Sequence, residues 1–553
     1  MGSTSTISLY SHPKLSHRAQ PVLSRSFCQA RDAPLSFALP FSGTRRCFRL
    51  KRLVVKAAAR PEGGRRQRRV YRQSQSDNAL TTAPVKQIAS FVVPAGVFVS
   101  ATFGAGTNLL SGFTGKLFRE SKQTLNEFAK ELRAFSSVDM SDVLAYTRFW
   151  AGRNFGDEGL FFLAESLGYN QTAEEVSFAA NGITAAGIKA FDGVLQSNIA
   201  LKTLNLSGNP IGDEGVKCLC DILVDNAGVE RLQLSSVDLR DEGAKAIAEL
   251  LKNNSILRVL ELNNNMIDYS GFTSLAEALL ENSTIRSLHL NGNYGGALGA
   301  NALAKGLEGN KSLRELHLHG NSIGDEGIRA LMSGLSSRKG KLAVLDIGNN
   351  SISAKGAFHV AEYIKNCKSL LWINLYMNDI GDEGAEKIAD ALKQNRTITT
   401  IDLLDLAYNP IGADGAKALS EVLKFHGNIN TLKLGWCQIG AIGAEFVADM
   451  LRYNNTISIL DLRANGLRDE GAKCLAQSFK VVNEALTSID LAFNEIRDDG
   501  AFAIAQALKA NEDVAVTSLN LANNFLTKFG QSALTDAKDL VYEMSEKEVN
   551  IFF

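Results

Sequence analysis

One phrase returns along most of this chain at nearly constant spacing, and the repetition limits the folds open to it. In one unit the phrase reads Leu204-Asn-Leu206-Ser-Gly-Asn209-Pro-Ile211-Gly-Asp-Glu-Gly215. Thirteen units stand in phase when they are aligned on its Asn position, at Asn181, Asn209, Val237, Asn265, Asn293, Asn321, Asn350, Asn378, Asn409, Cys437, Asn465, Asn494 and Asn524. The spacing is 28 or 29 residues, except 31 before Asn409 and 30 before Asn524. Such repeats indicate a solenoid in which each unit packs on its neighbours.

A single unit predicts a strand followed by a helix. Leu204 and Leu206 alternate with polar residues, so they predict a short strand with its leucines facing inward. We expect the Asn to bind backbone groups that leave strand pairing at the next turn. Asp213 predicts a helix start, where acids cap free amides, and Gly215 is expected to let that helix pack closely on the strand. The prediction is an α/β solenoid with parallel strands on the concave face and helices on the convex face.

The charge of the chain is uneven, although its total is zero. Up to Ser76 there are 16 Lys and Arg residues against two acids, and the rest holds 43 basic and 57 acidic residues. Residues 1–57 are also rich in Ser and have no early apolar core, so they predict an organelle transit peptide rather than a secretory signal. Residues 53–59 resemble a chloroplast stromal cleavage site. The alternative is a disordered basic tail that binds nucleic acid or membrane, and we expect no nucleic-acid partner.

Residues 58–115 predict a basic linker and an apolar, Gly-rich segment. The stretch Ile88–Phe113 contains no charged residue and is long enough to span a bilayer. Pro94 and four glycines weaken a helix there. Both a membrane contact through Ile88–Phe113 and an apolar arm that packs on the repeats or stays free remain open. Five cysteines beyond the leader show no paired metal-binding spacing, which fits a reducing compartment.

Three further segments complete the predicted organisation. Residues 116–173 predict a helical N-terminal cap with a degenerate repeat, in which Arg153–Gly159 matches part of the phrase. Residues 174–537 hold the repeats themselves. Residues 538–553 predict a C-terminal cap over the last unit.

The phrase closely resembles the ribonuclease-inhibitor type of leucine-rich repeat, which also forms the arrays of NOD-like receptors and of the Ran GTPase-activating protein. This resemblance implies a horseshoe with strands on the concave face. With the leader, the chain is similar to plastid-targeted plant members of the group, which include an embryo-defective class. Val237 and Cys437 depart from the Asn of the phrase. The unit from Ile401 carries an extra Leu404-Asp405-Leu406 phrase, which leaves its strand register open.

The motifs of catalysis and cofactor binding are weak in this chain. Pairs such as Asp241-Glu242 recur at one phase of the repeat, so helix capping is favoured over acid/base chemistry. Gly115-Lys116 and Gly340-Lys341 lack the upstream Gly of a phosphate loop. Gly320-Asn-Ser322-Ile-Gly324 matches a nucleophile motif but lies inside the repeat phrase. We therefore predict a protein that is not an enzyme and has no cofactor.

The concave face is the least regular part of the repeats and holds the candidate site. The predicted partner-binding residues are His289, His317, His319, Asp346, Trp372, Tyr376, Asp405, Lys433, Trp436 and Arg463. Exposed aromatic rings beside charges are typical of protein interfaces. The three histidines fall on adjacent predicted strands, about 4.8 Å apart. Imidazoles suit zinc, but the sequence fixes no carboxylate or Cys beside them, so we expect no metal. A solvated polar face is the remaining alternative.

These observations favour a non-enzymatic scaffold in the chloroplast that binds a protein partner on the concave face. The alternative is a GTPase-activating or regulatory protein acting on a plastid GTPase, by resemblance to the Ran-activating protein. The acidic tail of that family is missing, because residues 542–553 mix the two signs of charge. An enzyme inhibitor is a third class, which the low cysteine count weakens.

Overall fold

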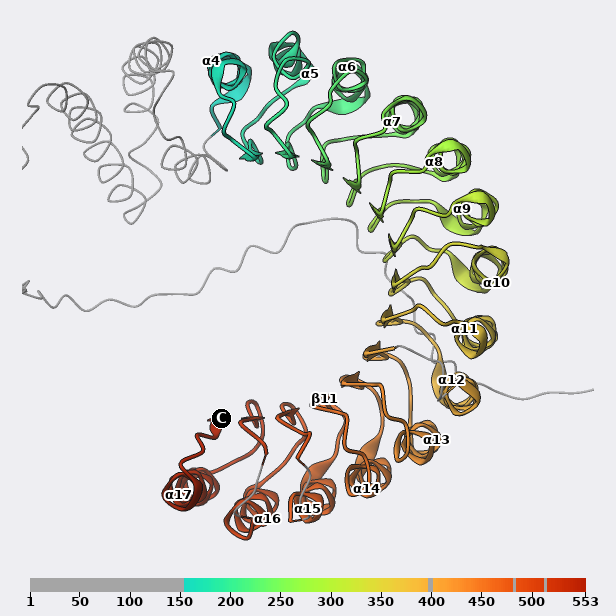
Figure 1. The fold of residues 1–553 in the computed structure, drawn as a ribbon. Helices are drawn as coiled ribbons and strands as arrows, with labels where there is room; N and C mark the ends of the chain where they lie inside the picture. Colours follow the sequence, from blue (N-terminus) through green and yellow to red (C-terminus); the bar gives the residue numbers. More distant parts are fainter. Residues whose placement is uncertain (1–153, 396–400, 481–483, 512–514) are drawn as a thin grey trace, which may run out of the picture. The chain divides into compact units, whose positions relative to one another are not determined.

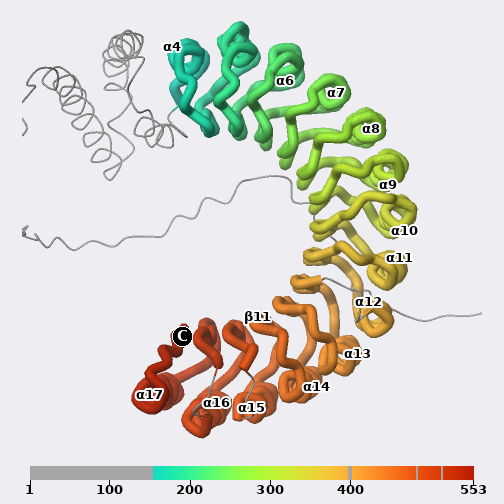
Figure 2. Tube along the Cα trace, in the orientation of Figure 1, coloured from blue at the N-terminus to red at the C-terminus, as the bar shows by residue number. Residues whose placement is uncertain are grey.

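Parallel strands form one open sheet of 14 strands in the described part of the chain, and their order in the sheet follows the sequence. The computed structural model describes residues 154–395, 401–480, 484–511 and 515–553. Figure 1 shows the strands along the inner side of a curved array and the helices along its outer side. Figure 2 shows the same regular stacking in the Cα trace. The predicted α/β repeat solenoid is therefore confirmed.

Several predictions concern residues outside this description. They are the transit peptide at 1–57, the linker and apolar segment at 58–115 and most of the N-terminal cap at 116–173. Within the part that the structure describes, none of the helices combines the length and the apolar character that crossing a bilayer requires.

Every strand is three residues long, and its central residue pairs with the central residue of the next strand, as Leu204 does with Leu232. The central residues of β1–β13 are buried, because they face the helices, and Ile551 of β14 is half-buried. The strands are β1 (Glu175–Ser177), β2 (Thr203–Asn205), β3 (Arg231–Gln233), β4 (Val259–Glu261), β5 (Ser287–His289), β6 (Glu315–His317), β7 (Val344–Asp346), β8 (Trp372–Asn374), β9 (Leu403–Asp405), β10 (Thr431–Lys433), β11 (Ile459–Asp461), β12 (Ser488–Asp490), β13 (Ser518–Asn520) and β14 (Asn550–Phe552).

The helices cover the outer side of the buried leucines and isoleucines, which form one continuous core along the array. Each helix packs mainly on the helices of the two neighbouring repeats. The helices are α4 (Gly156–Tyr169), α5 (Ala185–Ile188) with a 3-10 turn at Lys189–Phe191, α6 (Gly212–Leu223), α7 (Asp241–Asn253), α8 (Tyr269–Glu281), α9 (Gly296–Gly309), α10 (Gly324–Ser337), α11 (Ala354–Asn366), α12 (Gly381–Asn395), α13 (Ala413–Leu423), α14 (Gly440–Leu451), α15 (Arg468–Phe479), α16 (Asp498–Lys509) and α17 (Lys528–Ser545).

The register of the irregular unit, which the sequence left open, is settled by strand pairing. Leu404 lies opposite Ile373 on one side and Leu432 on the other. Leu404 and Leu406 are both fully buried, so they are the paired leucines of this unit. The extra residues of the 31-residue interval therefore precede β9 and leave the sheet unbroken.

The end of the array contains a strand that the sequence did not predict. Residues 550–552 form β14, in which Ile551 lies opposite Leu519 of β13. The segment was expected to cap the last unit, and it extends the sheet by one strand. Its alternation is short and lacks the repeat phrase, so no periodic signal marks it.

The buried Asn of the phrase binds the turn as expected. In Asn350, Nδ2 donates to the carbonyl oxygens of Leu318 and Gly348, both at 2.9 Å. Its Oδ1 accepts from the N–H of Asn321 at 2.9 Å and of Ile323 at 3.3 Å. One amide thus joins two repeats, and the same pattern recurs along the array. It satisfies backbone groups that have no strand partner.

A second row of buried asparagines stands where most helices end, and the sequence analysis missed its role. Asn310 donates to the carbonyl oxygens of Leu279 and Asn282 and accepts from the N–H groups of Ser312 and Leu313. This row, which we call the helix-end ladder, comprises Asn198, Asn226, Asn254, Asn282, Asn310, Asn395, Asn454 and Asn511. His426 occupies the equivalent place one repeat before Asn454.

The Asp of the phrase caps a helix, but not the helix that it begins. Oδ1 of Asp213 accepts from the N–H groups of Arg240 and Gly243, which start the next helix along the array. A Cβ on Gly243 would lie 2.6 Å from that oxygen. The Asp therefore caps a helix, as expected, but the helix that it caps belongs to the next repeat. The recurring Gly of the phrase makes room both for the turn residue of its own repeat, such as Leu239 beside Gly243, and for the neighbouring repeat.

Replacing Asn350 by Ala is expected to destabilise the array strongly. The change leaves the buried N–H groups of Asn321 and Ile323 without their acceptor, and each such group costs about 1–3 kcal/mol. We expect the free energy of unfolding in urea to fall by roughly 3 kcal/mol or more. Asn253→Ala, which removes an exposed amide at a helix end, is the matched control and should leave it nearly unchanged. Equal midpoints for the two variants would contradict this account of the turn.

His426 should weaken the array as the pH falls. Its side chain is 2% exposed, and neither ring nitrogen has a hydrogen-bond partner among the described residues. Burial lowers the pKa of His426, so the unfolded chain takes up a proton below its ordinary pKa of about 6.5 while the folded chain stays neutral. Stability is therefore lost as the pH falls below about 6.5, by at most about 1.4 kcal/mol per pH unit.

His426→Asn restores the amide of the helix-end ladder and removes this titration. We expect a higher thermal midpoint at pH 7 and a larger gain at pH 5.5, both read by circular dichroism. A gain that does not grow on acidification would show that His426 is not the group responsible.

Candidate functional site

In-register pairing brings the third residue of each strand into one row along the inner face. Since every strand contributes at the same position, neighbours in the row come from repeats that are neighbours in sequence. From β4 to β11 the row reads Glu261, His289, His317, Asp346, Asn374, Asp405, Lys433 and Asp461. Five of the ten predicted site residues stand in this row.

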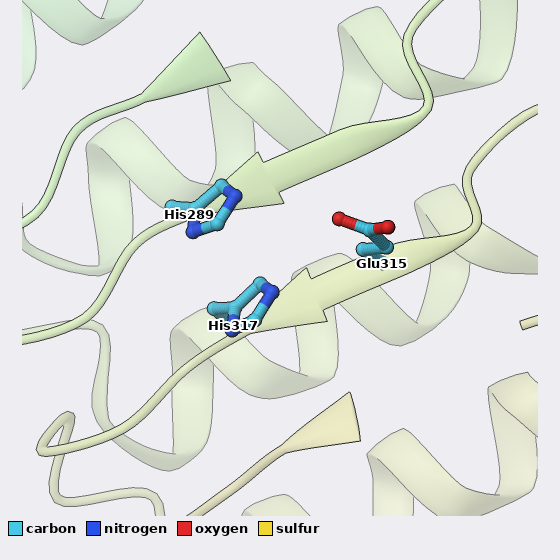
Figure 3. A group of neighbouring side chains, drawn as sticks. All are labelled: His289, Glu315 and His317. Carbon is cyan, nitrogen blue, oxygen red and sulfur yellow. The ribbon is translucent and has the colours of Figure 1, made fainter. Parts of the chain in front are cut away.

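His289 and His317 are direct neighbours in it, as the repeat phase predicted. Their rings stack with centroids 4.1 Å apart and 4° between the planes. Burial, together with the charge of His317, lowers the pKa of His289 to about 4, so its imidazole is neutral near pH 7. Glu315 lies beside both rings in Figure 3, and the sequence analysis had not singled it out.

Asp346 links two of the histidines. It is 7% exposed, and its carboxylate accepts from Nδ2 of Asn374 at 2.9 Å and from the N–H of Gly348 at 3.2 Å. Nδ1 of His317 and Nδ1 of His319 each lie 3.7 Å from one of its oxygens. Burial alone would raise the pKa of Asp346, but these contacts outweigh it and hold the pKa well below its usual range.

Two aromatic residues of the β8 repeat contact these histidines. The Trp372 and His317 rings have their centroids 5.9 Å apart. The Tyr376 and His319 rings lie 6.1 Å apart although a whole repeat separates them. That repeat carries Gly348, where a Cβ would lie 2.5 Å from Nδ1 of His319. The missing side chain at Gly348 therefore lets His319 and Tyr376 meet.

Aromatic contacts continue from β8 toward β12. Ring centroids lie 4.8 Å apart for Tyr376 and Tyr408, 5.1 Å for Tyr408 and Trp436, and 5.9 Å for Trp436 and Phe493. We call these four residues the aromatic cluster. Ala464 stands at the equivalent place between Trp436 and Phe493, and its small side chain lets the two rings meet. Trp436 is 43% and Phe493 46% exposed, so the cluster presents open ring surface.

Three members of the aromatic cluster occupy an unfavourable backbone position, directly before the buried residue of the turn. The φ angle is +55° at Tyr408, +56° at Trp436 and +58° at Phe493. Other repeats place a glycine there, such as Gly208 and Gly292. A side chain at positive φ costs roughly 1–2 kcal/mol. The aromatic residues thus stand here against the local backbone preference.

The charges beside the aromatic cluster are paired. Nζ of Lys433 lies 3.1 Å from a carboxylate oxygen of Asp405, and a terminal guanidinium nitrogen of Arg463 lies 2.8 Å from Asp461. Both carboxylates are nearly buried, whereas Arg463 is exposed and Lys433 is half-buried. The acids are therefore compensated, and cationic groups remain accessible from the inner face.

The ten predicted residues thus form two neighbouring groups that meet at the β8 repeat. His289, His317, His319, Asp346 and Trp372 make up the histidine group. Tyr376 and Trp436 belong to the aromatic cluster, and Asp405, Lys433 and Arg463 flank it. Sequence reasoning missed Glu315, Tyr408 and Phe493. A signal existed for Tyr408, because it stands 28 residues before Trp436, at the same phase of the repeat.

Comparison with known proteins supports the repeat reading. The family model described as a leucine-rich repeat matches residues 197–220, 309–332, 366–389, 394–420, 428–448, 453–476 and 482–505. No curated protein matches the sequence. Similar solved structures include an internalin (InlF) of Listeria monocytogenes strain 4b F2365, at 19% identity and a TM-score of 0.40, covering 68% of this chain and 92% of that one.

A second similar structure is the yeast Rad7 and Elc1 complex, at 14% identity and a TM-score of 0.36, covering 71% of this chain and 95% of the matched chain. The seven matched segments of the family model fall on strand–helix units of the sheet described above, those of β2, β6 and β8–β12. The protein therefore carries a leucine-rich repeat array.

Proposed function

We propose that this protein is a non-enzymatic scaffold that binds a protein partner through the inner face of its repeats. The observation that carries the proposal is the aromatic cluster. Leucine-rich repeats generally mediate protein–protein interaction, and Trp and Tyr side chains supply much of the binding energy at protein interfaces. The open faces of Trp436 and Phe493 are the part of this surface that a partner would cover.

The backbone conformation of the aromatic cluster also supports a binding role. Tyr408, Trp436 and Phe493 each stand at a positive φ that Gly or Asn would adopt at lower cost. Bulky residues in such conformations concentrate at binding sites, where their side chains serve a purpose other than stability. The flanking Lys433 and Arg463 give the aromatic centre a polar, partly cationic rim, which is the usual composition of an interface.

The finer parts of the proposal concern repeat type and location. Units of 28 or 29 residues, with helices α6–α16 of 11 to 15 residues, support the ribonuclease-inhibitor type of repeat. The Ser- and Arg-rich composition of residues 1–57 supports a chloroplast location, in the stroma. The uncharged stretch Ile88–Phe113 leaves membrane contact open as an alternative.

Replacing Tyr408, Trp436 and Phe493 together by Asn should abolish partner binding without unfolding the array. Asn tolerates positive φ, so the backbone is relieved while the ring surface is lost. Each lost anchor is expected to cost about 2 kcal/mol or more of binding energy, which removes the partner from an affinity purification. The readout is the set of proteins retained by the full chain, identified by mass spectrometry.

The matched control removes three exposed rings from the outer helices, with Tyr269→Ala, Phe358→Ala and Phe502→Ala. It should retain the same partners as the unaltered chain. If the inner-face variant also keeps them, the aromatic cluster is not the binding site. A GTPase among partners lost only from that variant would favour the regulatory alternative.

Import into isolated chloroplasts tests the location. We expect the chain to become resistant to external protease and to shorten near residue 57, as seen by gel electrophoresis. Carbonate extraction then separates a stromal protein from one anchored through Ile88–Phe113. Full-length protein left outside the organelle would overturn the chloroplast proposal.

A further inference from the structure

The histidine group contains the donor set of a metal site. His289 ends β5, and Glu315 and His317 begin and end β6, so all three side chains rise from the same face of adjacent strands. One potential ligand atom from each residue lies within 4.8 Å of the other two. Figure 3 shows the two rings side by side, with the carboxylate next to them. All three residues are half-buried, which limits competition from bulk water.

The surroundings orient these side chains. Oγ of Ser287 donates to Oε2 of Glu315 at 2.7 Å and lies 2.8 Å from Nε2 of His289. On the other side, Asp346 faces Nδ1 of His317, which leaves Nε2 of that ring for a ligand. A carboxylate behind a ligating histidine is the usual outer partner in zinc sites, since it fixes the ring and raises its basicity.

We propose that His289, Glu315 and His317 bind one divalent transition-metal ion of the Zn²⁺ class on the inner face of the array. Two imidazoles and one carboxylate are a common protein donor set for Zn²⁺, whereas Ca²⁺ and Mg²⁺ prefer oxygen ligands throughout. Ring rotation about the side-chain bonds closes the ligand atoms onto a shared ion, with Zn–N distances of about 2.0–2.1 Å.

Three protein ligands leave a fourth tetrahedral position for water or for an oxygen donor of a bound molecule. Oγ of Ser287 contacts both Glu315 and His289, so it lies beside two of the three proposed ligands. The site is separate from the aromatic cluster, so the Tyr408, Trp436 and Phe493 variant described above should bind the metal normally. Failure of one proposal therefore leaves the other standing.

The test is a calorimetric titration of the metal-free full chain with Zn²⁺ alone. We expect one equivalent to bind tightly to the unaltered chain and to raise its thermal midpoint. His289→Ala, His317→Ala and Glu315→Gln should each weaken that binding by more than the roughly 10–100-fold typical of changes in outer partners. Asp346→Asn, which alters only the carboxylate behind His317, should fall within that range.

His359→Ala, in helix α11 away from the cluster, is the matched control and should bind as the unaltered chain does. Cobalt absorption then separates this site from the thiols, because thiolate ligands add an intense charge-transfer band that imidazole and carboxylate ligands lack. Glu315→Gln keeps the side-chain shape, so it decides the result if an alanine variant unfolds. Zn²⁺ binding of equal affinity in Glu315→Gln and the unaltered chain, or a thiolate band, would overturn the proposal.

Discussion

Buried amides that close the turns after the strands help to hold together a sheet whose strands are only three residues long. A short strand offers few hydrogen bonds, and the chain leaves the sheet at once toward a helix. Asn350 shows how the gap is bridged, since one side chain serves the backbone of its own repeat and of the preceding one. The helix-end ladder joins the backbones of neighbouring repeats in the same way, at the places where most helices end. These two rows hold successive repeats in one register, and every feature of the inner face follows from that register.

Because the register is fixed, residues at equivalent positions of neighbouring repeats lie next to each other in space. His289 and His317 stack because they share a phase, and Lys433 meets Asp405 for the same reason. Contacts across a whole repeat need one further condition, a small residue in between. Gly348 provides it for His319 and Tyr376, and Ala464 for Trp436 and Phe493. The alternation of large and small residues at equivalent positions of successive repeats therefore decides which side chains meet on the inner face of an otherwise uniform sheet.

Much of this could be predicted from the sequence, for a physical reason. The period and the Leu alternation specify strands, and the phase specifies which residues share the inner face. Contacts between repeats were harder to predict, because the sequence of a single unit does not reveal which groups of the next unit it binds. Asp213 read within its own unit indicates a cap on its own helix, whereas it binds the N–H groups of Arg240 and Gly243. The role of the helix-end asparagines was hidden in the same way.

The candidate site was predicted less completely. The position of a residue in the repeat tells which face it lies on, but it does not tell which side chains are long enough to contact each other. Tyr408 and Phe493 stand where other repeats carry a turn glycine, and the sequence analysis did not single them out. Glu315 stands two residues before His317 and was passed over, because the first strand position varies widely between repeats. Strand geometry nevertheless puts alternate residues of one strand on the same face. Glu315 lies two residues before His317 in β6, on the same face, and His317 lies 28 residues after His289, on the adjacent strand. Together these two spacings place Glu315 beside both histidines.

The two groups on the inner face are joined through Asp346. Its oxygens lie equally far from Nδ1 of His317 and Nδ1 of His319, and His319 in turn stacks on Tyr376. His317 and His319 therefore share one carboxylate as a neighbour. Asp346 and His319 therefore connect the histidine group to the aromatic cluster, although the three proposed metal ligands and the aromatic cluster share no residue.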